Sequence, residues 1–251
     1  MTAIVAADTI LHNAKIWRGY EEGTCAALAI WQGRVLAAGT DDEMLALKGP
    51  DTKVIDLDGA FATPGLNDNH LHLMALGIGM AWIDAGPEVH RTLKSLQAAI
   101  VERAAQTPKG DWVIARGYDQ VKLDIGRHPD RSELDEAAPD HPVMLSRACG
   151  HVTLGNSKAL EAAGIDETTV VPQGGVIEQV NGRLTGLLAE TAQGLLRHAT
   201  PEPDVEDLID AAERAGQYLL SRGITSCMDA AVGMVNGMKE IRAYHLAKTS
   251  G

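Results

Sequence analysis

The sequence predicts an α/β protein in which a small β-rich module precedes a larger region of alternating strands and helices. The first residues contain short β-biased segments separated by tight turns, whereas strand-like and helix-like segments alternate after Pro64. The chain has 251 residues, of which 45% are hydrophobic, enough for one large core or two modest ones. We therefore expect one module over residues 1–63 and a second over residues 64–251.

The first module is predicted to be strands joined by short turns. Residues 7–17 and 26–38 are β-biased, and Gln32-Gly33 interrupts the second segment as a tight hairpin turn. Residues 41–48 read as a short helix with acids in its first turn, which the following glycine can close. Residues 53–57 alternate as another strand. We expect this module to have a packing role.

The segment T-P-G-L-N-D-N-H-L-H-L that opens the second module carries the clearest chemical signal. On a strand, Asp68, His70 and His72 share one side, while Leu71 and Leu73 face the other. Two imidazoles on one strand form half of a site for Zn, Fe, Ni or Cu, and the other ligands must come from elsewhere. With nine histidines in the chain, chance alone gives about 0.3 H-x-H pairs, as with any short motif. A buried or surface pair without an ion is the alternative.

Strands and helices then alternate. Residues 93–105 carry a helical apolar face, and residues 112–118 follow as a buried strand. Ser132 is predicted to cap a short helix. Residues 142–146 form a third strand whose far end leads to His151.

Residues 150–203 are long for a connection between strands. Asn156-Ser157 begins a short helix, Asn181-Gly182 predicts a hairpin, and residues 187–198 read as helical. We expect an elaborated connection of the kind that forms lids or binding loops.

The remaining residues form the last predicted strand and two helices. Residues 205–222 are strongly amphipathic and end at Gly223, residues 224–228 form a fourth strand, and residues 236–248 form a helix.

Composition limits the partners. The net charge of −12 disfavours nucleic acid and suits a neutral or cationic small substrate. The apolar runs all fall short of the ~18 residues that cross a membrane. Three cysteines without a dense framework, and an N-terminus unlike a signal peptide, predict a reducing, cytoplasmic location. We interpret Cys149 and Cys227 as ordinary buried thiols.

Several separated motifs occur together in one order. They are T-P-G-L-N-D-N-H-L-H-L (63–73), W-V-I-A-R-G-Y-D (112–119), R-x-x-L-D (131–135), P-D-H-P-V-M-L-S-R (139–147), G-H-x-x-x-x-N-S-x-A-L (150–160), G-G-V-I (174–177) and T-G-L-L-A-E (185–190). Nearly the whole chain thereby resembles the amidohydrolase superfamily, and most closely its amidohydrolase-3 branch, the YtcJ-like group that includes N-substituted formamide deformylases.

The resemblance implies a fold and an activity. The implied fold is a partial (β/α)8 TIM-type barrel, with about its first four βα units, preceded by a small β-sandwich-like domain. The implied activity is hydrolysis of a non-peptide C–N bond in a small amide-type substrate through water activated by a divalent metal, most simply zinc. Members of the branch are about twice as long, so the chain resembles an N-terminal half. Further ligands and the general base then lie outside it.

The resemblance also suggests roles for individual residues. His70 and His72 match metal ligands, and Asp68 matches a residue that orients an imidazole. Glu190 matches a glutamate that reaches the metal or acts in catalysis, and a solvated helix residue is the alternative. His151, at a strand end, would hold substrate or stabilise an oxyanion, or else cap or pack.

Asp119 and Arg147, at comparable strand ends, are weaker candidates. The rival hypothesis for the whole chain is a non-catalytic half. Its open sheet edge would then be covered by another copy of the chain, as a homo-oligomer, or by a complementing C-terminal half.

Overall fold

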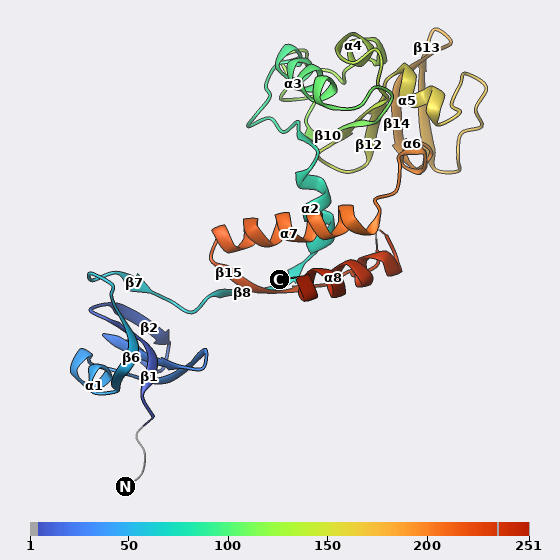
Figure 1. The fold of residues 1–251 in the computed structure, drawn as a ribbon. Coiled ribbons are helices and arrows are strands. Elements are labelled where there is room, and N and C mark those ends of the chain that lie inside the picture. The colour runs from blue at the N-terminus through green and yellow to red at the C-terminus, as the bar shows by residue number, and fades with distance from the viewer. Residues whose placement is uncertain (1–4, 235, 251) are drawn as a thin grey trace. The chain divides into compact units, whose positions relative to one another are not determined.

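The computed structural model describes residues 5–234 and 236–250 and has a mixed α/β fold (Figure 1). Contacts divide the chain into two compact units. The first comprises residues up to Asp68 together with Gly223–Ser226, and the second comprises Asn69–Arg222 and the residues from Cys227 onward.

The first unit contains a four-stranded and a three-stranded sheet. The four-stranded sheet has the order β5-β4-β1-β6, with β1 antiparallel to β4 and parallel to β6, and the other has the order β3-β2-β7. Ile10, Ala27 and Met44 are buried in the core of this unit. The elements are β1 (Ala7–His12), β2 (Lys15–Gly19), β3 (Gly23–Cys25), β4 (Ala27–Trp31), β5 (Arg34–Gly39), α1 (Asp41–Leu45), β6 (Lys48–Asp56) and β7 (Phe61–Ala62).

Two local predictions can be compared with this unit. The β4–β5 hairpin is confirmed, because Gln32 and Gly33 both have positive φ, 49° and 72°, as a tight primed turn requires. The predicted length of the helix over 41–48 is wrong. Helix α1 begins with a Thr40–Glu43 capping box but ends at Leu45, and Lys48 already pairs with Ala7 in the sheet. Strand pairing therefore overrides the helical pattern.

Strands β8 (Leu66–Leu71) and β15 (Ile224–Asp229) form a separate two-stranded sheet. The Leu66 N–H donates to Gly223 O, and the Ala230 N–H donates to Leu71 O. These bonds join start to start and end to end, so the two strands run parallel.

Three helices of the second unit share a core. Helix α2 (Leu73–Met80) follows β8, α7 (Val205–Ser221) precedes β15, and α8 (Met238–Ser250) follows it. Their core contains Met74, Leu208 and Ala243, among others. Helices α2 and α7 approach so closely that a Cβ on Gly77 would lie 1.9 Å from Ala211 O.

A six-stranded sheet lies between α2 and α7 in sequence. Its order is β13-β14-β12-β11-β10-β9, with β9, β10 and β11 parallel and the other three joined antiparallel. The elements of this segment are β9 (Ile83–Asp84), α3 (Leu93–Gln106), β10 (Val113–Tyr118), α4 (Arg131–Ala137), β11 (Val143–Arg147), β12 (Val152–Gly155), α5 (Ser157–Ala162), β13 (Gly175–Val180), β14 (Arg183–Glu190) and α6 (Gln193–Ala199).

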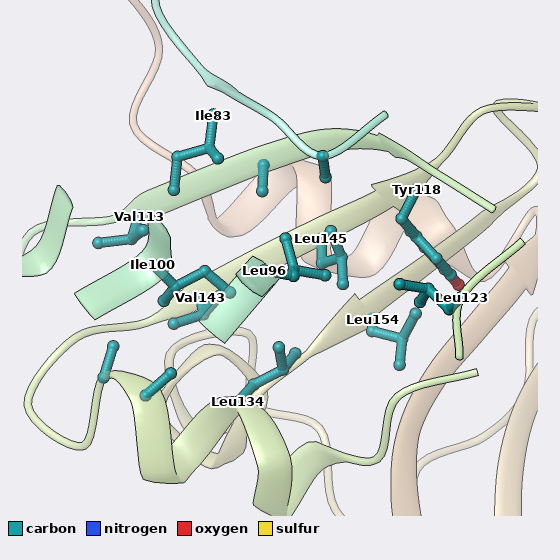
Figure 2. Close-up of a cluster of buried hydrophobic side chains, with 14 of the residues drawn as sticks. Ile83, Leu96, Ile100, Val113, Tyr118, Leu123, Leu134, Val143, Leu145 and Leu154 are labelled. Carbon is teal, nitrogen blue, oxygen red and sulfur yellow. The ribbon is translucent and has the colours of Figure 1, made fainter. Parts of the chain in front are cut away.

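Alternate side chains of the sheet enter two different cores. Val143 and Leu145 join the cluster that includes Leu96 of α3 and Leu134 of α4, which Figure 2 shows. Met144, between them on β11, joins the cluster covered by α5 and α6. Both faces of the central strands are therefore buried, which explains the continuous apolar sequence of β11.

The structure corrects the count of barrel strands. The four predicted strands do not lie in one sheet, because β8 pairs with β15 whereas β10 and β11 belong to the six-stranded sheet. The β8–β15 pairing joins residues more than 150 positions apart, and strand patterns do not reveal which strands are neighbours.

Two further corrections concern local structure. The 150–203 segment is not mainly a loop. It adds three strands to the sheet, and residues 187–190 belong to β14 rather than to a helix. The N-cap of α4 is Asp130, not Ser132, because Asp130 forms a capping box with Glu133.

Among the described residues, no helix combines the length and apolarity needed to cross a membrane.

Candidate functional site

His70 and His72 lie where β8 gives way to α2. His70 is on the strand, whereas His72 is one residue past its end and is the N-cap residue of α2. Both side chains are exposed, and their ring centroids are 5.4 Å apart with an interplanar angle of 75°. A metal lies about 2.0–2.1 Å from a ligating imidazole nitrogen, so rings this close can share one ion.

The pair is half of a metal site. Among residues 5–234 and 236–250, no group of three or more His, Cys, Asp or Glu side chains is placed to hold an ion. In particular, Glu190 is not brought into one cluster with the two imidazoles. Asp68 is half-buried on β8, and its expected role of orienting an imidazole stays a prediction.

Asp229, which the sequence argument did not single out as a functional residue, holds the start of α2. The Tyr244 hydroxyl donates to Asp229 Oδ2 at 2.6 Å. Burial raises the pKa of Asp229, but the bonds from Tyr244 and from backbone N–H groups, including those of Met74 and Leu73, outweigh it and leave the pKa below its ordinary value. This carboxylate thereby links the end of β15 to the helix that His72 begins.

His151 and Glu190, predicted separately, form a pair. His151 Nδ1 lies 3.0 Å from Glu190 Oε2, and the Glu190 N–H donates to His151 O. Their hydrogen bond raises the pKa of His151, although both side chains are exposed. Glu190 ends a strand with φ of 53°. The pair can therefore present a protonated imidazole to a ligand.

Cys149 and Arg147 extend this region. The His151 N–H approaches Cys149 Sγ at 3.4 Å, and this contact, with a smaller effect of Arg147, lowers the pKa of the thiol. Arg147 Nε donates to Gln120 Oε1 at 2.5 Å, and Arg147 Nη2 lies 3.9 Å from Asp119 Oδ1. The interpretation of Cys149 and Cys227 as buried is wrong, because both are exposed.

A large open cleft, with a volume of about 1180 Å³, lies in the second unit. Its lining includes the C-terminal ends of β10 and β11, the last turn of α2, the segment before α7 and residues that follow β15. Arg116, Arg147 and Arg197 all line it. Of the predicted candidates only Arg147 is in this lining, and His70, His72, His151 and Glu190 are outside it as far as the described residues show. The alternation along 112–118 was the one signal that could have assigned Arg116 to the side opposite buried Ala115.

The fold and the exposed histidine pair together indicate the class of protein to which the chain belongs. The chain aligns over 97% of its length, with a TM-score of 0.72 and 27% identity, to an uncharacterized metal-dependent hydrolase from Pyrococcus furiosus. A similar structure from Pyrococcus horikoshii gives a TM-score of 0.71 at 26% identity, also over 97% of the chain. The alignments cover 47% and 46% of those chains. The chain therefore has the fold of part of a metal-dependent hydrolase.

Sequence comparison names the family. The model of the amidohydrolase family matches residues 53–251, and the chain belongs to that family. It is 34% identical over 239 residues to the protein YtcJ of Bacillus subtilis, covering 94% of the chain and 43% of that relative. It is 31% identical over 250 residues to the N-substituted formamide deformylase of Arthrobacter pascens, covering 97% and 45%. The resemblance inferred from the motifs is confirmed, and the chain spans less than half the length of these relatives.

Proposed function

We propose that this chain is the part of a metal-dependent amidohydrolase that supplies the first two metal ligands, His70 and His72. The observation that carries the proposal is the pair of exposed imidazoles 5.4 Å apart at the end of β8, in a chain of the amidohydrolase family. The proposed reaction is hydrolysis of a non-peptide C–N bond in an amide or formamide, as the name of the Arthrobacter pascens relative suggests.

The proposed architecture assigns β8 and β15 to the first strands of a (β/α)8 barrel. Parallel pairing and the packing of α2, α7 and α8 support this assignment. The six-stranded sheet is then an insertion between α2 and α7, and the first unit is part of a small β-sandwich. Barrel enzymes place their sites at the C-terminal ends of the strands, which is where His72 lies.

The residues have distinct proposed roles. A divalent ion, most simply zinc, supplies Lewis acidity and a bound water of lowered pKa when it is held by His70 and His72. Asp229 accepts hydrogen bonds from the backbone N–H groups of Leu73 and Met74 and so holds the start of α2, next to His72. His151, whose protonated form is favoured by the hydrogen bond with Glu190, donates a hydrogen bond to a substrate oxygen. Because the structure pairs Glu190 with His151, we propose it as the partner of this imidazole rather than as a metal ligand.

A second candidate is a half that has no activity without a partner. It is favoured by the lack of a third ligand close to the histidine pair within the described residues. The open edges of the β8–β15 sheet would then pair with a second copy of the chain or with a complementing C-terminal half.

Metal binding tests the proposal. Zinc affinity is measured by competition with a chromogenic chelator for the wild-type chain, His70→Ala, His72→Ala and the double variant. Weak binding that either substitution abolishes is expected, because two ligands hold an ion poorly and one holds it worse. His245→Gln, at an exposed histidine of α8, is the matched control and should bind as the wild type does.

Activity separates the two candidates. Formate release from N-butylformamide is measured with the chain alone and with the C-terminal half of a relative added as a separate chain. Zinc-dependent release only in the second case supports the enzyme assembled from two parts.

In the metal-binding experiment, zinc binding that survives in the His70→Ala/His72→Ala double variant contradicts the proposed site.

A further inference from the structure

The cleft of the second unit has a charge opposite to that of the chain. The chain carries a net charge of −12, yet three arginines, Arg116, Arg147 and Arg197, line this one cleft. The lining contains two carboxylates, Asp84 and Glu202, and Lys239 neutralises Glu202 at 2.9 Å. Positive charge is therefore in excess in the cleft.

The arginines are incompletely neutralised by the protein. Arg197 donates to the neutral oxygens Gly150 O, at 3.4 Å, and Gln193 Oε1, at 3.2 Å. Arg147 reaches a carboxylate, Asp119, only at 3.9 Å. Within the described part of the chain, Arg116 and Arg197 form no ion pair. Guanidinium groups without carboxylate partners are suited to bind carboxylate or phosphate oxygens, often in a bidentate manner.

Asn236 adds an unused donor. Its backbone N–H donates to buried Glu240 at 2.7 Å, which fixes the residue at the cleft. Its side-chain Nδ2 is buried and has no hydrogen-bond partner among residues 5–234 and 236–250. A buried amide donor without a partner is unfavourable, and an oxygen of a ligand in the cleft would satisfy it.

The position of the cleft also indicates a ligand. Arg116 lies near the C-terminal end of β10, and Arg147 ends β11, the parallel neighbour of β10. In parallel α/β sheets, ligands bind in the crevice outside these ends of the strands.

We propose that this cleft binds an anionic oxygen group, a carboxylate or a phosphate, carried by the substrate. That the anionic group belongs to the substrate rests on the proposed function, but the binding of an anion in the cleft does not depend on catalysis. It reverses the expectation of a neutral or cationic substrate that net charge alone suggested, because local charge rather than total charge selects the ligand.

Isothermal titration calorimetry tests the proposal with three probes. Succinate and inorganic phosphate represent the two anions, and succinamide has the size of succinate without its charge. We expect the chain to bind at least one anion and to bind succinamide at least tenfold more weakly. The anion affinity should fall as sodium chloride is raised. Equal affinity for succinate and succinamide, with no response to phosphate, overturns the proposal.

Variants locate the binding. Arg116→Gln and Arg197→Gln should each lower the affinity for the more tightly bound anion at least tenfold. Arg116→Lys, which keeps the positive charge, should lose less affinity than Arg116→Gln. Arg183→Gln, at an exposed arginine of β14 outside the cleft lining, is the matched control and should bind as the wild type does. Circular dichroism checks that each variant is folded. Equal weakening by the control and cleft variants means that binding follows total charge, and it overturns the proposed site.

Failure of the proposed anion site and failure of the proposed function give different results. Anion binding together with no zinc-dependent hydrolysis, even when the C-terminal half is added, supports the proposed anion site and counts against the proposed enzyme. Hydrolysis that prefers an uncharged formamide over a matched carboxylate-bearing formamide supports the enzyme and overturns the cleft.

Discussion

His151 Nδ1 lies 3.0 Å from Glu190 Oε2, although 39 positions separate the two residues in sequence. Adjacent strands bring them together, because β12 begins just after His151, β14 ends at Glu190, and Val152 pairs with Ala189. The hydrogen bond favours the protonated imidazole, so the pKa of His151 lies above its ordinary value.

Glu190→Gln is expected to lower the pKa of His151 toward that of a free histidine. The raised pKa means that this pair stabilises the fold below the unfolded pKa of about 6.5 and loses that contribution as pH rises through the folded value. NMR titration of the His151 Cε1–H resonance measures the pKa directly. Glu161→Gln, at an exposed glutamate paired with Lys158, should leave it unchanged. An identical His151 titration in wild type and Glu190→Gln would contradict the pairing.

Gly77→Ala and Gly216→Ala are expected to change stability in opposite directions. A Cβ on Gly77 would lie 1.9 Å from Ala211 O, so α2 and α7 must move apart, at a cost of about 1–3 kcal/mol or more. Outside the adjoining backbone of α7, no described atom lies within 4 Å of a Cβ on Gly216, so this alanine should add about 0.5–1 kcal/mol of helix stability. Urea unfolding measures both, and destabilisation of equal size would refute the close approach of the helices.

Asp130→Ala should reduce the free energy of unfolding by about 1 kcal/mol, because it removes the N-cap of α4. Ser132→Ala should cost much less. Among the described residues, the Ser132 hydroxyl donates to Asp130 Oδ1 and pairs with no backbone group of the helix. Urea unfolding of the two variants compares the caps, and a larger loss for Ser132→Ala would restore the cap that the sequence predicted.

Sequence patterns predicted elements better than they predicted neighbours. Helix α7 and the hairpin at Asn181-Gly182 follow from an amphipathic period and from a dipeptide that adopts positive φ, both of which are local properties. The pairing of β8 with β15 is not local, because it depends on which apolar faces are buried together after 150 intervening residues fold. The assignment of the strands predicted over 112–118 and 142–146 to the barrel failed for that reason.

The candidate site also has a part that sequence patterns predicted and a part that they did not. The spacing of His70 and His72 predicted rings on one side, and the rings are 5.4 Å apart, although His72 begins a helix instead of extending the strand. Arg147 was a candidate from the sequence, but its grouping with Arg116 and Arg197 could not be predicted, because these residues come from distant elements and only the folded sheet places them in one cleft. Motif spacing thus reveals sites built on one segment and misses those assembled from several.

Cys149 is expected to be alkylated at lower pH than a free thiol. The His151 N–H, and after it Arg147, favour the thiolate and hold its pKa below the ordinary value, and the side chain is exposed to reagent. Iodoacetamide labelling resolved by peptide mass spectrometry should give a midpoint for Cys149 below about 8.5, the value for a free cysteine.

Two comparisons decide the cause of this Cys149 reactivity. The same peptide in the urea-unfolded chain should show the ordinary midpoint, because unfolding removes both the His151 N–H and the guanidinium. Arg147→Gln should raise the Cys149 midpoint in the folded chain only partly, since the backbone donor remains, whereas Arg183→Gln should leave it unchanged. A Cys149 midpoint that is the same in the folded and the unfolded chain would show that neither donor stabilises the thiolate, and it would contradict the contact between the His151 N–H and Cys149 Sγ.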